Sequence, residues 1–184
     1  GDSDLDLALL TSPFAHIALG EVLPANPWNG LRMAAIVYDL IPVLFPERYL
    51  SSNRLLARAY YDSLLHLRGY DLFLAISQTT KLDCERLLGC DAERVVTIGS
   101  ASAPHFFTPP NEPLTASEQA QLARQGIRDP FVFTVSGPDY RKNVDGFLDA
   151  FRRLPASVRA GHQCVIACWL PEHEQRRLRD LARG

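Results

Sequence analysis

The sequence has little net charge and no long apolar run. Its 19 Lys and Arg against 21 Asp and Glu give −2 at pH 7, and the basic residues are scattered, which argues against a nucleic-acid partner. No apolar run reaches the roughly 18 residues that a membrane-spanning helix needs. No basic segment followed by an apolar one, as in a secretory signal, stands at the start. We therefore expect a globular cytoplasmic protein that binds no nucleic acid.

Metal-binding and cofactor-binding patterns are also missing. The four cysteines form no C-x-x-C pair and have apolar or helical neighbours; they are Cys84, Cys90, Cys164 and Cys168. This favours buried thiols in a reducing cytoplasm over a metal site. The absence of G-x-G-x-x-G, P-loop and G-x-S-x-G motifs argues against NAD enzymes, ATP enzymes and serine hydrolases of that type. We expect no metal and no cofactor.

Apolar strand-like runs and helix-period segments alternate along the chain. Strands are expected at residues 6–10, 32–38, 71–76, 94–98, 131–135 and 162–169. Helices are expected at 53–67, 79–88, about 115–125, 143–153 and 171–182, with loops at 15–31 and 43–47. This alternation predicts the α/β class with parallel sheets.

A proline-rich stretch separates the alternating strands and helices into two groups. Residues 108–117 hold three prolines and no apolar periodicity, which is typical of a linker. We therefore expect pieces of two domains, at residues 1–108 and 131–184. Residues 109–130 would form the linker and a short helix.

Residues 135–143 (Val-Ser-Gly-Pro-Asp-Tyr-Arg-Lys-Asn) connect a predicted strand to a predicted helix. Ligands bind at such strand ends in open α/β sheets, and a helix start favours an anion. Arg141 and Lys142 add positive charge that suits a phosphate or diphosphate. The alternative is an ordinary turn with two solvated cations, which loop chemistry alone slightly favours.

Four segments, in chain order, resemble motifs of glycosyltransferase family 4. Residues 38–47 (YDLIPVLFPE) resemble its HDLIP…FPE segment, and residues 75–80 (AISQTT) resemble its AIS…T strand-to-helix turn. Residues 96–99 (VTIG) and 106–109 (FFTP) resemble the VIPNGVD…F.P stretch that closes its first domain. Residues 135–143 are similar to the VGxxxPRKN loop that opens its second domain. The resemblance to the family, in the same order, covers nearly the whole chain.

The resemblance implies a GT-B architecture, with two Rossmann-like domains and a cleft between them. It implies retaining transfer of a sugar from a nucleotide-diphosphate donor to a glycan or lipid-linked acceptor, as in cell-envelope polysaccharide synthesis, without a bound catalytic metal. The family's acidic E-x7-E-type motif would lie beyond Gly184, so we expect the chain to be partial and inactive alone. Peripheral membrane contact would come from regions outside it.

The resemblance also assigns roles to individual residues. Lys142 matches the family's phosphate-binding lysine and would neutralise charge on the leaving diphosphate. Arg141 would assist Lys142 in this role, or it would form an ion pair with a neighbouring side chain. Gly137 stands where many members carry a second phosphate-binding arginine, although other members have Gly there.

Tyr38 and Asp39 are the expected catalytic residues. Many family members have histidine at the position of Tyr38, near the donor sugar and the acceptor. A phenol cannot do the same proton chemistry at neutral pH but can hydrogen-bond a hydroxyl. Asp39 could position an acceptor hydroxyl, or it could cap the following turn. Of the Tyr60–Tyr61 pair, the outward ring could contact an acceptor, although core packing is favoured; His16 and His105 are weaker candidates.

Two other readings stay open. The chain could be a non-catalytic binding or regulatory module of the same fold, because Tyr38 and Gly137 replace reactive groups. It could instead be an unrelated flavodoxin-like ligand-binding domain, which requires the motif matches to be accidental.

Overall fold

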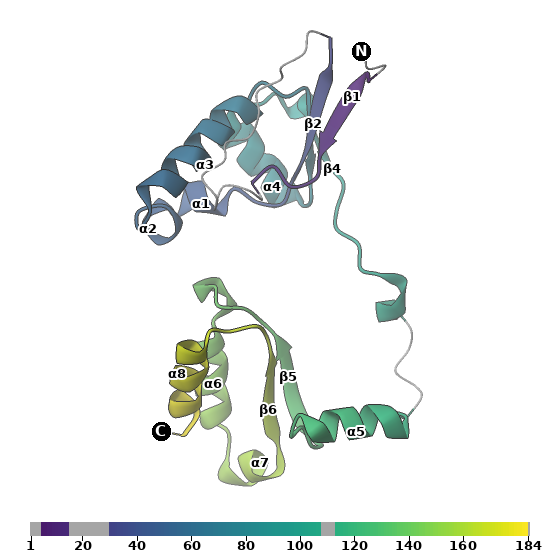
Figure 1. Cartoon of the computed structure of the whole chain (residues 1–184), viewed down its shortest axis with the longest axis vertical. Helices are drawn as coiled ribbons and strands as arrows, with labels where there is room; N and C mark the ends of the chain where they lie inside the picture. Colours follow the sequence, from purple (N-terminus) through teal and green to yellow (C-terminus); the bar gives the residue numbers. More distant parts are fainter. Residues whose placement is uncertain (1–4, 15–29, 108–112, 184) are drawn as a thin grey trace. The chain divides into compact units, whose positions relative to one another are not determined.

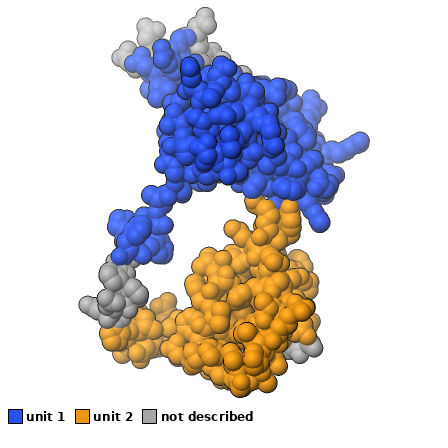
Figure 2. All heavy atoms as spheres, turned by 180° about the vertical axis from the view of Figure 1, so that it is seen from behind, with its two compact units in different colours: residues 1–107 blue, residues 108–184 orange. Residues whose placement is uncertain are grey.

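A computed structural model describes residues 5–14, 30–107 and 113–183. The loop expected at 15–31 lies almost wholly outside the described residues, and so does His16. Thr108 and Pro109 of the FFTP segment are outside them as well. The chain divides into two compact units, Gly1–Phe107 and Thr108–Gly184, which are coloured separately in Figure 2. Each unit is described by itself below.

Unit 1 is built on a four-stranded parallel sheet in the order β1-β2-β3-β4 (Figure 1). Its strands are β1 Leu7–Leu10, β2 Arg32–Val37, β3 Leu72–Ala75 and β4 Val95–Thr97. The central β2 is buried over most of its length, as expected of an apolar strand covered on both faces. All four strands lie within the segments predicted from the sequence.

The helices of unit 1 follow the sheet's strands. They are α1 Ile41–Leu44, α2 Pro46–Tyr49, α3 Arg54–Leu67, α4 Gln78–Asp83, the π-helix Cys84–Leu88, and the 3-10 turns Ala92–Arg94 and Pro104–Phe107. The loop predicted at 43–47 is wrong, because the structure has α1 and α2 there. Pro42 and Pro46 stand in the first turns of these helices, where a missing N–H costs no hydrogen bond.

Helix α3 packs against the sheet through one stripe. Asn53 caps it, since its Oδ1 accepts from the N–H groups of Leu55 and Leu56 at 3.0 and 3.1 Å. The buried stripe comprises Ala59, Tyr60, Ser63, Leu64 and Leu67. The spacing of the apolar residues in the sequence also predicts Leu55 on this inner face, but its side chain is 76% exposed. The stripe runs through Leu56, one position further round the helix, so Leu55 faces outward.

Helix α4 begins earlier than predicted and joins the end of β2. The spacing of Thr80 and Asp83 in the sequence fits a capping box, but Ser77 is the cap, with its Oγ accepting from the Thr80 N–H at 3.1 Å. Thr80 is then free to donate from its Oγ1 to the carbonyl of Tyr38 at 3.0 Å. The helical segment ends before Gly89, as predicted, with that residue at φ 68°.

Unit 2 has a two-stranded parallel sheet, β5 Phe131–Val135 and β6 Gln163–Ala167. Its helices are α5 Ala116–Arg124, the 3-10 turn Tyr140–Lys142, α6 Val144–Arg152, α7 Ala156–Gly161 and α8 Glu172–Arg183. The short α7 was not predicted. Figure 1 shows α6 and α8 together on one side of the two strands, where Leu148, Leu170 and Leu178 form a small core. Both units confirm the α/β class with parallel sheets.

Candidate functional site

Tyr38 and Asp39 lie directly after β2, at the carboxyl edge of the parallel sheet. Their backbone is fixed by the buried Val37 on one side and by the hydrogen bond from Thr80 to the Tyr38 carbonyl on the other. The Tyr38 side chain is 55% exposed. Asp39 Oδ1 accepts from the Ile41 N–H at 3.1 Å, so this carboxylate caps the turn into α1. Its Oδ2 has no hydrogen bond within the described residues and remains able to accept one from a ligand.

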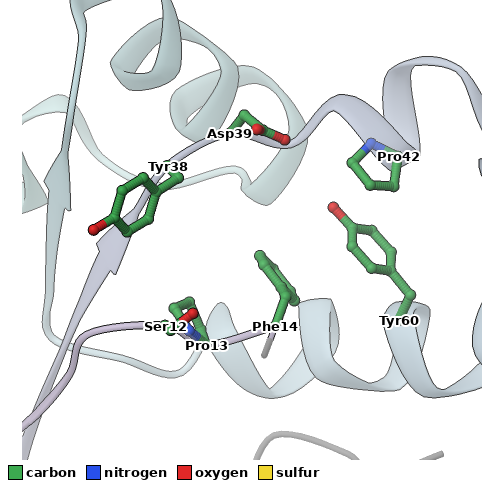
Figure 3. A pocket seen from close by; sticks show the side chains of 7 residues that line it. All are labelled: Ser12, Pro13, Phe14, Tyr38, Asp39, Pro42 and Tyr60. Atoms are coloured by element: carbon green, nitrogen blue, oxygen red, sulfur yellow. The ribbon is translucent and has the colours of Figure 1, made fainter. Parts of the chain in front are cut away.

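A pocket of about 260 Å³ opens beside these two residues (Figure 3). It is lined by Ser12, Pro13, Phe14, Tyr38, Asp39, Pro42 and Tyr60. The lining comes from the segment after β1, the segment after β2, and α3. Because β1 and β2 run parallel, their carboxyl ends meet at one edge of the sheet, which is where ligands bind in open α/β folds.

Tyr60, for which the sequence favoured core packing, also lines this pocket. Its place on the inner face of α3 predicted core packing, and it is indeed buried, with 3% of its surface exposed. Its hydroxyl has no hydrogen-bond partner in the described part of the chain. Burial, and secondarily the charge of Asp39, raises the pKa of Tyr60, so its hydroxyl stays protonated. Phe14 stacks on its ring at a centroid distance of 4.8 Å.

The predicted anion-binding loop of unit 2 folds as a 3-10 turn, Tyr140–Lys142, followed by α6. Asn143 joins the two in the left-handed conformation, φ 46° and ψ 45°, and its Oδ1 accepts from the Gly146 N–H at 3.2 Å. A side chain at position 146 would meet the Asn143 side chain at 2.5 to 2.8 Å. The glycine therefore leaves room for the helix cap.

Arg141 and Lys142 differ in their surroundings. Arg141 is held by Asp139, with Nε to Oδ1 at 3.0 Å and Nη2 to Oδ2 at 2.9 Å. Lys142 is exposed and forms no ion pair with any described residue. The local pairing that the sequence left open for Arg141 is therefore what the structure shows, while the Lys142 ammonium remains available to a ligand.

Gly137 lines a second pocket of about 260 Å³, and Arg141 and Lys142 are not among its lining residues. Its wall includes Arg177, which donates to both oxygens of Asp145 at 2.8 and 2.7 Å and to Glu174 at 2.7 Å. Hydrogen bonds from Arg177 lower the pKa of Asp145 and of Glu174. In the sequence, Arg177 is one of several charged residues of the predicted helix at 171–182, and nothing there distinguishes it. The positive charge of Arg177 in this pocket is already balanced by the carboxylates of Asp145 and Glu174.

Other candidates do not gather into a site. Within residues 5–14, 30–107 and 113–183, no three His, Cys, Asp or Glu side chains are placed to hold a metal ion. No helix in those same ranges has the length and apolar character to cross a membrane. The side chains of His66, His162 and His173 are all exposed.

Comparison with known proteins shows similarity to mannosyltransferases. No protein-family model matches the chain. The chain is 27% identical over 162 residues to the serotype-specific mannosyltransferase WbdA of Escherichia coli, across 87% of this chain and 19% of that protein. It is 26% identical over 142 residues to the O-antigen chain mannosyltransferase B of Escherichia coli, across 76% of this chain and 35% of that one. The chain thus spans about a fifth of the length of the WbdA relatives it matches.

Proposed function

We propose that the chain belongs to a retaining glycosyltransferase of the GT-B type, acting in the cytoplasm on cell-envelope polysaccharide. It would move a sugar from a nucleotide-diphosphate donor to a glycan or glycolipid acceptor. The observation that carries the proposal is the similarity to mannosyltransferases over 87% of the chain. A match of that length must include both Tyr38–Asp39 and the loop at 137–142. Mannose is accordingly the first sugar to test.

Unit 1 would supply the acceptor side. Asp39 Oδ2, which has no hydrogen bond within the described residues, lies in a pocket with aromatic and hydroxyl-bearing walls. Such a pocket suits a sugar, whose C–H faces pack on rings and whose hydroxyls need polar partners. Asp39 would orient the acceptor hydroxyl, and the exposed ring of Tyr38 would form the rim of the same pocket.

Unit 2 would supply the donor side through Lys142. Lys142 directly precedes Asn143, the residue that caps the amino end of α6. The helix dipole favours an anion at that end. Charge builds up on the diphosphate as the sugar leaves, and a cation aimed at that charge lowers the barrier. Arg141, paired with Asp139, would contribute less.

A second candidate function is a binding or regulatory module of the same fold, without turnover. Two observations favour it. The hydroxyl of Tyr38 is directed away from the pocket (Figure 3). Around Gly137, the second pocket is lined by Asp139, Asp145 and Glu174, which repel a phosphate.

Titration of the protein with UDP, GDP and ADP tests the donor site. We expect one of them to bind, and Lys142→Ala to weaken that binding by about tenfold or more, as for the loss of a hydrogen bond to a charged group. Arg153→Ala is the matched control, because it removes one exposed positive charge at the far end of α6. Unchanged affinity in Lys142→Ala would remove this lysine from the donor site.

Incubation of the complete protein with nucleotide-linked mannose separates the two candidates. An enzyme transfers mannose to a glycan or hydrolyses the donor slowly in its absence. A protein that binds the diphosphate through Lys142 but releases no nucleotide from any donor is a binding module.

A further inference from the structure

The Tyr60 hydroxyl is the least expected feature of unit 1. Its oxygen is closed to solvent and has no hydrogen-bond partner in the described residues. Leaving a buried hydroxyl unpaired costs about 1–3 kcal/mol, so such groups are uncommon and call for a reason. A phenylalanine would fill the same space at no such cost. The hydroxyl therefore points to a partner that the described residues do not supply.

The direction of the ring indicates where that partner sits. In Figure 3 the hydroxyl end of Tyr60 is directed toward the segment that carries Asp39 and Pro42. The charge of Asp39 is close enough to contribute to the raised pKa of Tyr60. Asp39 uses Oδ1 for the Ile41 N–H and has Oδ2 left over. A protonated donor and an unfilled carboxylate acceptor thus belong to the same pocket.

A ligand hydroxyl can bond to both the Tyr60 hydroxyl and Asp39 Oδ2. An alcohol hydroxyl accepts from a phenol and donates to a carboxylate at the same time. An ammonium cannot accept from Tyr60, and a carboxylate or phosphate is repelled by Asp39. The remaining walls include Pro13, Phe14 and Pro42, which suit the C–H face of a sugar ring.

We infer that Tyr60 is an acceptor-binding residue, which donates to one hydroxyl of an acceptor pyranose while that hydroxyl donates to Asp39 Oδ2. The inference rests on the proposed function and adds a sugar site in unit 1 with a defined hydrogen-bond pair. Since the Tyr60 oxygen is covered in the ligand-free pocket, side chains around it must move apart on binding. Phe14 is the side chain that stacks on this ring.

The test measures binding of methyl α-D-mannopyranoside and its four monodeoxy analogues by saturation-transfer NMR and calorimetry. We expect Tyr60→Phe to weaken binding of the parent glycoside about three- to tenfold, the worth of one hydrogen bond. One deoxy analogue should bind the unaltered protein more weakly still, because it also loses the hydrogen bond to Asp39, and it should lose nothing more in Tyr60→Phe, as a shared contact requires. Tyr61→Phe is the matched control, because that neighbouring ring is 42% exposed and does not line the pocket.

A stability measurement separates binding from a structural role. Removing an unpaired hydroxyl should leave the unfolding temperature unchanged or raise it. A lower unfolding temperature with unchanged glycoside affinity would show that Tyr60 has a partner inside the protein, and it would overturn the inference. So would the absence of glycoside binding by the unaltered protein.

The nucleotide titration distinguishes a failure of the inference on Tyr60 from a failure of the proposed function. If glycosides do not bind but a nucleotide diphosphate binds through Lys142, the inference on Tyr60 fails and the proposed function stands. If the glycosides bind through Tyr60 and no nucleotide diphosphate binds, the sugar site stands and the donor assignment fails.

Discussion

Among single residues, the cysteines show how burial sets chemistry. Cys84 and Cys90 are buried, while Cys164 and Cys168 are partly exposed. Burial, and secondarily the neighbouring Cys90, raises the pKa of Cys84 to about 12. Only the thiolate is a strong nucleophile, so Cys84 is both inaccessible and protonated near neutral pH. The sequence prediction of buried thiols is confirmed for two of the four residues.

Alkylation of the folded protein should therefore discriminate among the thiols. With iodoacetamide at pH 8, we expect Cys168 to be labelled well before Cys84, as followed by peptide mass spectrometry. In 8 M urea all four should react at similar rates, which controls for peptide recovery. Equal labelling of Cys84 and Cys168 in the folded state would contradict the burial described for unit 1.

Among the elements, α6 depends on one residue for its start. Asn143 adopts a left-handed conformation and also caps the helix through the Gly146 N–H. Asn tolerates this conformation better than other residues with a side chain. The sequence predicted a helix from residue 143 but not this conformation, since left-handed geometry follows from how the 3-10 turn meets the helix.

Substitutions of Asn143 should differ in stability according to whether they lose its helix cap, its tolerance of left-handed backbone, or both. Asn143→Ala loses the cap and puts a residue that tolerates left-handed backbone less well than Asn at this position, for a cost of about 2 kcal/mol in the unfolding free energy of unit 2. Asn143→Gly loses the cap but fits the backbone, so its cost should stay below about 1 kcal/mol. Trp169 fluorescence in urea, in a Trp28→Phe background, measures both. A glycine variant as unstable as the alanine variant would argue against a left-handed Asn143.

At the scale of the whole molecule, the two units differ in their cores. The core of unit 1 joins the sheet to α3 and includes fully buried Val37, Leu40, Leu67, Tyr70 and Phe73. In unit 2 the described core has three buried residues, and Phe133 and Val135 on β5 are exposed. Because apolar burial is the main favourable term in folding, unit 1 should be the more stable of the two.

Hydrogen exchange of the intact chain should resolve this difference. We expect the amides of β2 and β3 to exchange at least tenfold more slowly than those of β5 and β6, because local stability limits opening. Peptide-resolved mass spectrometry provides the measurement, and exchange in urea corrects for intrinsic rates. Comparable protection in both sheets would mean that the small core of unit 2 stabilises it as well as the larger core stabilises unit 1.

The sequence by itself determined the class and the placement of the main elements. Apolar periodicity is a local property, and it located the six strands of the described residues, with β5 at the predicted 131–135. It also drew attention to Asp39 and Lys142, because polar residues at the carboxyl ends of parallel strands are visible in the chain order. It missed α1, α2 and α7, whose short lengths leave no periodic signal.

Only the tertiary structure decided which side chains share a pocket. Phe14, Asp39 and Tyr60 belong to three segments, and no local pattern states that their side chains meet. Likewise, the pairing of Arg141 with Asp139 and of Arg177 with Asp145 depends on how turns and helices pack. These pairings determine which charges are already balanced and which, such as that of Lys142, remain for a ligand. The physical reason is that periodicity fixes the face of an element, whereas packing between elements fixes what that face meets.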